Sequence, residues 1–379
     1  MRVRSSRAVR TPSCSPTAGC TRSCTACSSA NSVTAVEQRL TELWYRDSAR
    51  PLLLQPLSWL YAGVMQARRG AYARGWLRTC AVGKPVVVVG NLTVGGTGKT
   101  PLVIWLARQL TDRGLKVGIV SRGYGRSVGA LRVVRSDSSW REVGDEPLLV
   151  ERRTGCATVV ARDRVAGARA LIEQGVDVVI ADDGLQHLRL ARDCEIVVVD
   201  GVRGFGNGRV LPAVPLSEPV SRLDAADAVV VNGVAEHASL VRVAAPVNAR
   251  ALQMTLVAGE ARRLDGQGAP QPLEQFRGRR LHAVAGIGNA ARFFRELRAR
   301  GLDIIEHPFP DHHAFAAGEV TFADELSVLM TEKDAVKCRA FGNPRHWYVP
   351  VAAEFSVAHT RELLDRVVRK LGSFSSVGG

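Results

Sequence analysis

The chain has 379 residues, and its most unusual bulk property is a formal net charge of +15. Hydrophobic residues make up 46% and charged residues 23% of the sequence. These proportions are typical of folded globular proteins and exclude a disordered or fibrous chain. The length is sufficient for two domains, each with its own hydrophobic core.

The excess positive charge is concentrated near the N-terminus. Residues 1–84 contain 13 Lys or Arg residues against only three acidic residues, Glu37, Glu42 and Asp47. A basic segment of this kind attracts nucleic acid or anionic lipid. The alternative is that the basic side chains only face solvent. The residues that lie between the charges distinguish these interpretations.

Residues 1–32 contain four of the eight cysteines in a stretch without Asp or Glu. Only Cys24 and Cys27 have the CxxC spacing of a metal site, and the first histidine is His187, which argues against zinc. The stretch also lacks the apolar run of a secretory signal. We expect residues 1–32 to be a disordered extension, or the product of an overlong gene model whose true start lies near Val33.

Residues 33–80 are predicted to form a basic amphipathic segment that associates with a membrane. Pro56 suits the first position of a helix. Apolar residues then follow helical spacing at Leu57, Leu60, Tyr61, Val64 and Met65. Arginines and aromatic residues follow at Arg68, Arg69, Tyr72, Arg74, Trp76 and Arg78. This pattern is typical of a helix in the lipid headgroup layer, and the alternative is a helix packed on the protein's own core.

Residues 81–235 are predicted to form an α/β domain. Short apolar runs rich in valine alternate with helical stretches, which indicates a mostly parallel sheet flanked by helices. The predicted strands are Val86–Val89, Val117–Val120, Thr158–Val160, Val178–Ile180, Ile196–Val199 and Val229–Val231. The predicted helices are Leu102–Leu110 and Arg164–Gln174.

Residues 236–379 are predicted to form a second, smaller α/β domain, after a boundary near residue 235 where the pattern weakens. Its predicted elements are Leu281–Ala285, Phe293–Arg300, Val328–Met330 and Arg361–Leu371. We expect residues 281–340 of this domain to contribute to an active-site cleft.

The strongest motif is the run from Val86 to Thr100, VVVVGNLTVGGTGKT, followed by a predicted helix. A buried strand, a glycine-rich turn and a helix that starts at Lys-Thr form the context of a phosphate-binding P-loop. Backbone N–H groups of such a turn surround phosphate oxygens at a helix N-terminus. The predicted nucleotide-binding residues are Thr93, Val94, Gly95, Gly96, Thr97, Gly98, Lys99 and Thr100. One departure from the strict motif is Thr93, which stands where the first glycine is expected.

A pair of carboxylates follows the predicted strand Val178–Ile180. Asp182 and Asp183 end the apolar run VDVVIADD, as the acidic residues of a Walker B element do. We expect one of them, together with the Thr100 hydroxyl, to bind Mg²⁺. The alternative, that paired aspartates only form a turn, is weaker downstream of a P-loop.

Several further motifs resemble those of the tetraacyldisaccharide 4'-kinase family, the lipid A 4'-kinases of Gram-negative bacteria. They are NLTVGGTGKTP, SRGYGR (Ser121–Arg126), GDEP (Gly144–Pro147), DDGLQH (Asp182–His187), DG…GNGRVLPAxPLxEP (Asp200–Pro219), FPDHH (Phe309–His313) and MTEKDAVK (Met330–Lys337). The resemblance covers roughly residues 40–370 in collinear order. It implies a P-loop NTPase-like kinase that uses ATP and Mg²⁺.

The resemblance also implies the partners and the location of the protein. The acceptor would be a lipid A disaccharide 1-phosphate, phosphorylated at its 4'-hydroxyl. The protein would act as a peripheral or monotopic protein on an anionic membrane surface, at the cytoplasmic face of the bacterial inner membrane. Neither nucleic acid nor a protein partner is expected.

Phosphoryl transfer to a sugar hydroxyl needs charge neutralisation and a general base. Lys99 and Arg122 are candidates for neutralising the transferred phosphate. Asp145 of the GDEP motif is the candidate base and His312 its partner, because the resemblance implies that these two form a dyad. The alternatives are a helix N-cap for Asp145 and a surface histidine for His312.

Three further residues are candidates for contact with the substrate: Gln186, His187 and Glu218. The stretch Leu211–Glu218 departs from the family at two positions, where Val214 stands for a Gly and Ser217 for an Arg. Because serine cannot replace a charged contact to phosphate, the second change removes one expected contact to the anionic substrates.

Three rival functions fit the sequence less well. A GTPase or an ATPase of the deviant-Walker class usually carries a lysine where this chain has Val94, and Thr331–Asp334 reads TEKD rather than [NT]KxD. A ligase acting on a soluble metabolite has no use for the basic N-terminal helix. A nucleic-acid-binding module lacks the repeated aromatic and basic residues on strands.

Overall fold

The computed structural model describes residues 55–93, 95–127, 129–206, 216–243 and 251–372. All of them belong to one compact unit, residues 42–379. The predicted extension 1–32, the start of the membrane-associating segment, Val94 and Val214 lie outside the described residues.

The larger sheet has nine strands and contains every strand predicted before residue 235. In spatial order these are β14 (Val351–Phe355), β8 (Leu252–Ala258), β7 (Ala228–Asn232), β6 (Cys194–Asp200), β1 (Val86–Asn91), β5 (Val178–Asp182), β2 (Val117–Ser121), β4 (Ala157–Val160) and β3 (Arg132–Val134). All pairs from β8 to β4 are parallel, whereas the edge strands β14 and β3 run antiparallel to their neighbours. The carboxyl ends of the parallel strands therefore meet at one edge of the sheet, where α/β proteins bind ligands.

Helices cover both faces of this sheet, which explains why its strands are continuous apolar runs. Side chains alternate along β1, so that Val87 and Val89 face one core and Val86 and Val88 the other. The first core is closed by α3 (Lys99–Thr111), α5 (Asp145–Thr154) and α12 (Val357–Gly372). The second is closed by α6 (Arg164–Glu173) and α7 (Ala238–Val243). The predicted α/β fold class is confirmed.

The smaller sheet has five strands. Their spatial order is β11 (Asp303–Pro308), β10 (Arg280–Ala285), β12 (Val328–Thr331), β13 (His346–Val349) and β9 (Arg262–Arg263), and only β9 is antiparallel to its neighbour. One face packs on α9 (Ala290–Ala299), and the other on α10 (Ala317–Val320) and α11 (Glu332–Cys338). The short helix α4 (Trp140–Val143) and the 3-10 turns Val220–Ala225, Leu273–Phe276 and Arg339–Phe341 complete the described elements.

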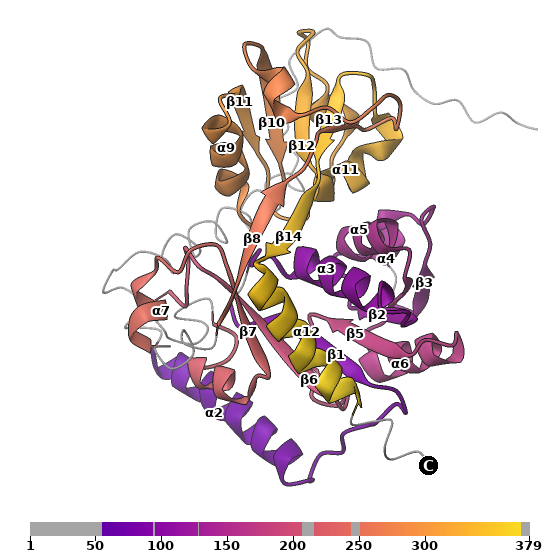
Figure 1. Cartoon of the computed structure of the whole chain (residues 1–379), viewed down its shortest axis with the longest axis vertical. Helices are drawn as coiled ribbons and strands as arrows, with labels where there is room; N and C mark the ends of the chain where they lie inside the picture. Colours follow the sequence, from indigo (N-terminus) through magenta and orange to yellow (C-terminus); the bar gives the residue numbers. More distant parts are fainter. Residues whose placement is uncertain (1–54, 94, 128, 207–215, 244–250, 373–379) are drawn as a thin grey trace, which may run out of the picture. The chain divides into compact units, whose positions relative to one another are not determined.

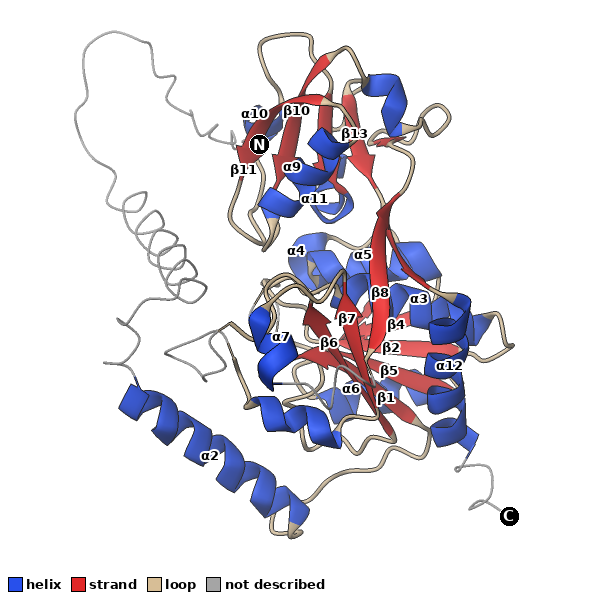
Figure 2. Cartoon of the chain, turned by 60° about the vertical axis from the view of Figure 1, so that its left-hand side comes forward, coloured by secondary structure: helices blue, strands red, loops and turns tan. Residues whose placement is uncertain are grey.

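The two sheets are joined by two neighbouring strands, β8 and β14, which pair antiparallel (Figure 1; Figure 2). The chain enters the smaller sheet after β8 and leaves it through β13 and β14. After β14 it returns as α12, which packs on β6 and β8 of the larger sheet. Residues 252–258 and 351–372 therefore complete the larger sheet and its cover, although they follow the predicted boundary at residue 235. Periodicity predicts strands but does not predict which sheet a strand joins.

The predicted N-terminal helix is present as α2 (Gln55–Ala73). Ser58 is buried on the side of the helix that faces the protein. The Tyr61 hydroxyl donates a hydrogen bond to the Ser217 carbonyl at 3.2 Å. Another side of the helix carries three apolar side chains that are each more than half exposed: Leu57, Leu60 and Val64. Three of the five apolar positions predicted for this helix are therefore exposed, whereas Tyr61 faces the protein. No helix among the described residues has the length and apolar character needed to cross a bilayer.

Candidate active site

The P-loop connects β1 to α3 at the carboxyl edge of the larger sheet. Gly98 precedes α3 with a φ of 96°, a conformation that favours glycine. A Cβ atom at Gly98 would also lie 2.7 Å from the Asn232 Nδ2 atom. The loop therefore needs glycine here for its backbone conformation and for the close approach of β7.

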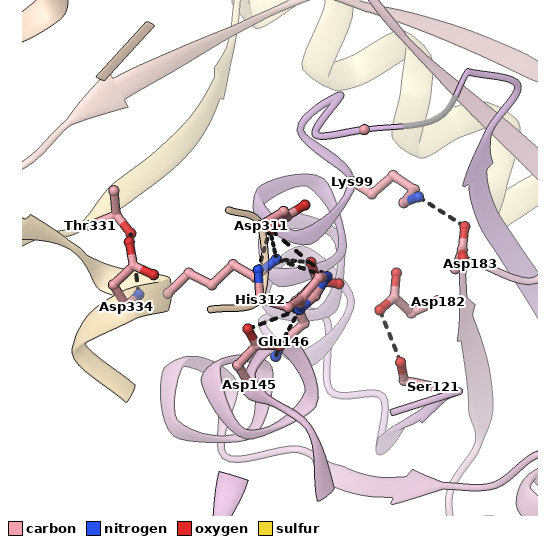
Figure 3. A network of polar contacts seen from close by, with 12 residues as sticks. Lys99, Ser121, Asp145, Glu146, Asp182, Asp183, Asp311, His312, Thr331 and Asp334 are labelled. Atoms are coloured by element: carbon pink, nitrogen blue, oxygen red, sulfur yellow. Dashed lines mark hydrogen bonds and ion pairs between the residues drawn. The ribbon is translucent and has the colours of Figure 1, made fainter. Parts of the chain in front are cut away.

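Lys99 is the first residue of α3 and points toward the acidic pair that ends β5 (Figure 3). Its Nζ donates to Asn91 Oδ1 at 2.7 Å and to Asp183 Oδ1 at 2.9 Å. Burial lowers the pKa of Lys99, but the charge of Asp183 and its hydrogen bond outweigh burial, so the pKa is raised. The lysine is therefore a fixed positive charge beside the glycine-rich turn.

Asp182 and Asp183 lie in different environments. Asp182 is buried, and its Oδ2 accepts a hydrogen bond from the Ser121 hydroxyl at 3.2 Å. Burial, with the charges of Glu146 and Asp183, raises the pKa of Asp182 to about 7. Asp183 is half exposed, and although partial removal from water would raise its pKa, Lys99 lowers it.

The residues at the end of β5 fit a bound Mg²⁺. The Oδ1 atom of Asp182 is buried, and no described residue donates a hydrogen bond to it. An unpartnered buried carboxylate oxygen is costly unless a cation or a proton compensates its charge. Oxygen atoms are the ligands that Mg²⁺ prefers, so Asp182, Asp183 and the Thr100 hydroxyl are a suitable donor set.

Asp145 and His312 are in contact, the first from a helix that covers the larger sheet and the second from a loop of the smaller sheet (Figure 3). Asp145 is the first residue of α5, and His312 lies in the loop after β11. The His312 Nδ1 atom lies 3.1 Å from both carboxylate oxygens of Asp145. Burial would raise the pKa of Asp145, but the hydrogen bond from His312 and the charge of Lys333 lower it to about 2. Asp145 is therefore a buried carboxylate that stays ionised.

His312 and Asp183 share a backbone feature. They are the two non-glycine residues with positive φ in the described part of the chain, at 59° and 54°. Such conformations cost energy and persist where the surrounding structure enforces them. Burial lowers the pKa of His312, but the hydrogen bond to Asp145 outweighs it, so the pKa is raised above 6.5.

Two lysines of α11 lie beside this pair. Lys333 donates to Glu146 at 2.8 Å and to Asp311 at 3.0 Å. Lys337 has a fully buried side chain, with its Nζ 2.8 Å from Asp334 Oδ1 and 3.8 Å from Asp145 Oδ2. The i, i+4 spacing of the two lysines in MTEKDAVK thus places both ammonium groups on one side of a helix, facing the first turn of α5.

The remaining predicted residues lie in varied surroundings. Arg122 and Gln186 are exposed, and the charge of Arg122 contributes to the lowered pKa of Asp183. The His187 Nε2 atom accepts a hydrogen bond from the Arg164 amide at 3.4 Å. Glu218 is buried and lies 3.3 Å from Arg222 and 3.8 Å from Arg69 of α2. Its ion pairs therefore connect Glu218 to α2 and to Arg222.

Ser217, which stands where the family has an arginine, turns toward the backbone. Its hydroxyl donates to the Leu92 carbonyl at 3.0 Å, and its N–H donates to the same oxygen at 2.7 Å. Ser217 thus holds its loop against the start of the P-loop.

The structure adds residues that the sequence did not single out. Asn232 ends β7, and its amide donates to the Thr97 carbonyl of the P-loop at 2.9 Å. Arg164 is buried at the start of α6, and its charge helps to lower the pKa of Asp183. Asn232 could have been found as a polar residue at the end of an apolar run. Lys333 could have been found from the MTEKDAVK motif, in which the sequence analysis assigns no role to the lysines.

The contrast between Asp182 and Asp183 predicts opposite effects on stability. Because the pKa of Asp182 is about 7 when folded, against 3.8 in its ordinary state, the unfolded chain releases this proton more readily. The free energy of unfolding therefore falls as pH rises from about 4 to about 7. Asp182→Asn should raise it by about 1–3 kcal/mol at pH 8 and have little effect at pH 4. Asp183→Asn loses an ion pair and should not stabilise the protein. Urea unfolding at both pH values measures this, and a destabilised Asp182→Asn at pH 8 would contradict it.

Comparison with known proteins places this site in a family. The family model for Tetraacyldisaccharide-1-P 4'-kinase, LpxK, matches residues 50–369. The tetraacyldisaccharide 4'-kinase of Alkalilimnicola ehrlichii is 50% identical over 345 residues, which cover 89% of this chain and 99% of that protein. The corresponding kinase of Stenotrophomonas maltophilia is 49% identical over 326 residues, covering 86% and 95% of the two chains.

A solved structure of LpxK from Aquifex aeolicus in complex with ATP has the same fold, with a TM-score of 0.70 and 28% identity. The match covers 85% of this chain and 99% of that protein. The predicted resemblance, the P-loop NTPase-like fold and the prediction of a kinase are confirmed. The chain belongs to the tetraacyldisaccharide-1-phosphate 4'-kinase family.

Proposed function

We propose that this chain transfers the γ-phosphate of ATP to the 4'-hydroxyl of a lipid A disaccharide 1-phosphate. The observation that carries the proposal is the contact between Asp145 and His312, which joins a buried ionised carboxylate from one sheet to a histidine from the other. A P-loop, an acidic pair suited to Mg²⁺ and a positioned carboxylate together supply what phosphoryl transfer to an alcohol requires. Family membership supplies the acceptor.

The nucleotide side of the reaction depends on the P-loop. Backbone N–H groups of Gly95 to Thr100 would bind phosphate oxygens at the N-terminus of α3. Lys99 now bonds to Asp183 and Asn91, and it would exchange these partners for the β- and γ-phosphates. Arg122 is exposed and close enough to Asp183 to lower its pKa, so it is placed to neutralise charge on the transferred phosphate.

Asp182, Asp183 and Thr100 would hold Mg²⁺, which neutralises phosphate charge when bound. Asp182 would lose its proton at the same time, because a metal ligand must be ionised. This proton loss makes metal affinity depend on pH near neutrality.

The acceptor side depends on Asp145. Because the carboxylate stays ionised, it can accept the proton of the attacking hydroxyl, and His312 orients it through Nδ1. Carboxylate oxygens have about four acceptor sites between them, so the bond to His312 leaves capacity for the sugar hydroxyl. Asp145 is thus the general base and His312 its positioning partner.

Three residues have less direct roles. Gln186 is exposed next to the acidic pair and is placed to contact the acceptor, and His187 lies beside it. Glu218, in contrast, is buried between Arg222 and Arg69. Its ion pairs support a role in holding α2 on the larger sheet.

The location that we propose is the cytoplasmic face of the bacterial inner membrane, where an anionic surface meets α2. The exposed side chains Leu57, Leu60 and Val64 form an apolar strip. Exposed Trp76 and Leu77 extend it beyond the helix. A helix with an apolar strip and flanking arginines lies in the plane of the headgroups.

The kinase proposal predicts label transfer to lipid. Incubation with γ-labelled ATP should move label to the tetraacyldisaccharide 1-phosphate and not to a soluble sugar. Lys99→Ala should reduce transfer by more than about 100-fold, because the developing charge loses its main partner. Lys84→Ala, at the opposite edge of the sheet, is the control. Wild-type turnover in Lys99→Ala, or label in the soluble sugar alone, would refute the proposal.

The membrane proposal predicts binding that salt weakens. Wild-type protein should float with anionic liposomes and dissociate as ionic strength rises, because salt screens attraction between the arginines and the surface. The triple variant Leu57→Ser, Leu60→Ser, Val64→Ser should bind more than about tenfold more weakly, since each apolar side chain contributes roughly 1 kcal/mol or more. Val357→Ser, which removes an exposed apolar side chain from α12, should bind like the wild type. Equal flotation of the triple variant would contradict the assignment of α2.

A further inference from the structure

The MTEKDAVK motif places Lys333 in contact with His312, the partner of the proposed base. Its Nζ atom lies 2.8 Å from Glu146 Oε1, 3.0 Å from Asp311 Oδ1 and 3.4 Å from His312 Nε2. Glu146 belongs to α5, and Asp311 and His312 belong to the loop after β11. Lys333 therefore connects the two sides of the candidate active site from a third element, α11.

The hydrogen-bonding roles around His312 follow from elementary chemistry. An ionised carboxylate can only accept, so the Nδ1 atom that faces Asp145 must carry a proton. A lysine ammonium can only donate, so the Nε2 atom that faces Lys333 must accept. Both conditions are met by one species, the neutral imidazole with its proton on Nδ1.

We propose that Lys333 is a positioning residue that opposes a proton on the Nε2 atom of His312 and so selects, for the neutral ring, the Nδ1–H tautomer that faces Asp145. The inference rests on the proposed role of His312 as the partner of Asp145. Its consequence is that Asp145, and not the imidazole, remains the free acceptor for a hydroxyl proton. The ammonium repels a second proton on the ring, and it also holds the Asp311–His312 turn, where His312 has a positive φ.

The other charged groups around His312 raise or lower its pKa according to their sign. Asp145 and Asp311 attract a proton to the ring, and Lys333 opposes this. Glu146 offsets part of the charge of Lys333, and the Lys337 Nζ atom lies 3.8 Å from Asp145 Oδ2. The Tyr124 ring, 4.9 Å away, covers the imidazole. Figure 3 shows Asp145, Glu146, Asp311 and His312 gathered together, with the Lys99–Asp183 pair apart from them.

The test is a titration of the imidazole nitrogens by NMR. The protein has eight histidines, and ¹⁵N-histidine labelling distinguishes protonated from unprotonated ring nitrogens in each. His312→Gln assigns the signal of His312. In the wild type, the neutral form of His312 should carry its proton on Nδ1.

Lys333→Met should raise the pKa of His312 by about one unit, because it removes a positive charge within hydrogen-bond distance. Lys333→Arg, which keeps the charge, should restore the wild-type titration. Lys84→Met removes a positive charge at the opposite edge of the larger sheet and should change nothing. Glu146 and Asp311 are partly exposed, so the loss of their partner should not unfold the protein.

Two results would overturn the proposal. One is a pKa of His312 in Lys333→Met that equals or lies below the wild-type value. The other is a neutral His312 with its proton on Nε2. Because the titration does not depend on turnover, it can fail while the kinase assignment stands, and lost activity alone would not support it.

Discussion

The contact between Asp145 and His312 is the interaction on which the rest of the structure depends. A carboxylate that is 4% exposed is costly to ionise unless charged donors surround it. Here those donors come from the smaller sheet: His312 from the loop after β11, and Lys333 and Lys337 from α11. The second sheet's unit therefore helps to keep the base of the proposed reaction ionised. This dependence explains why a P-loop fold carries a second α/β unit on the continuous strands β8 and β14.

The charged residues of the candidate site form two separate groups, one beside the P-loop and one beside the proposed base. Lys99 and Asp183 form one pair near the P-loop, and Lys333, Glu146 and Asp311 form another near the base. Between them Asp182 keeps a raised pKa, because it is buried and lies near the negative charges of Glu146 and Asp183. In the proposed reaction Asp182 would bind the metal and Asp145 would accept the hydroxyl proton. The two non-glycine residues with positive φ in the described chain, Asp183 and His312, lie one in each group, so backbone strain accompanies both tasks.

The sequence was sufficient to predict much of the fold and to nominate most residues of the candidate site. Valine-rich runs bounded by polar residues predict β1, β2, β4 to β7, β10 and β12, because strands buried on both faces must be apolar. The strands that were not predicted lie at edges or alternate with polar residues: β3, β8, β9, β11, β13 and β14. The P-loop and acidic pair were found from local spacing, whereas the contact of Asp145 with His312 came only through family resemblance. Asn232, Arg164 and Lys333 act through long-range contacts that no local pattern reveals.

The most direct test of the central claim is a double-mutant cycle on label transfer to the lipid acceptor. If Asp145 and His312 act as one unit, Asp145→Asn and His312→Gln should each lower kcat about 10²–10⁴-fold. The double variant should be hardly slower than the slower single variant, because residues that share one function do not contribute independently. His313→Gln, a change at the neighbouring histidine that pairs with Glu319 instead, should retain most activity. Losses that multiply in the double variant would show that the two residues act separately and would contradict the account.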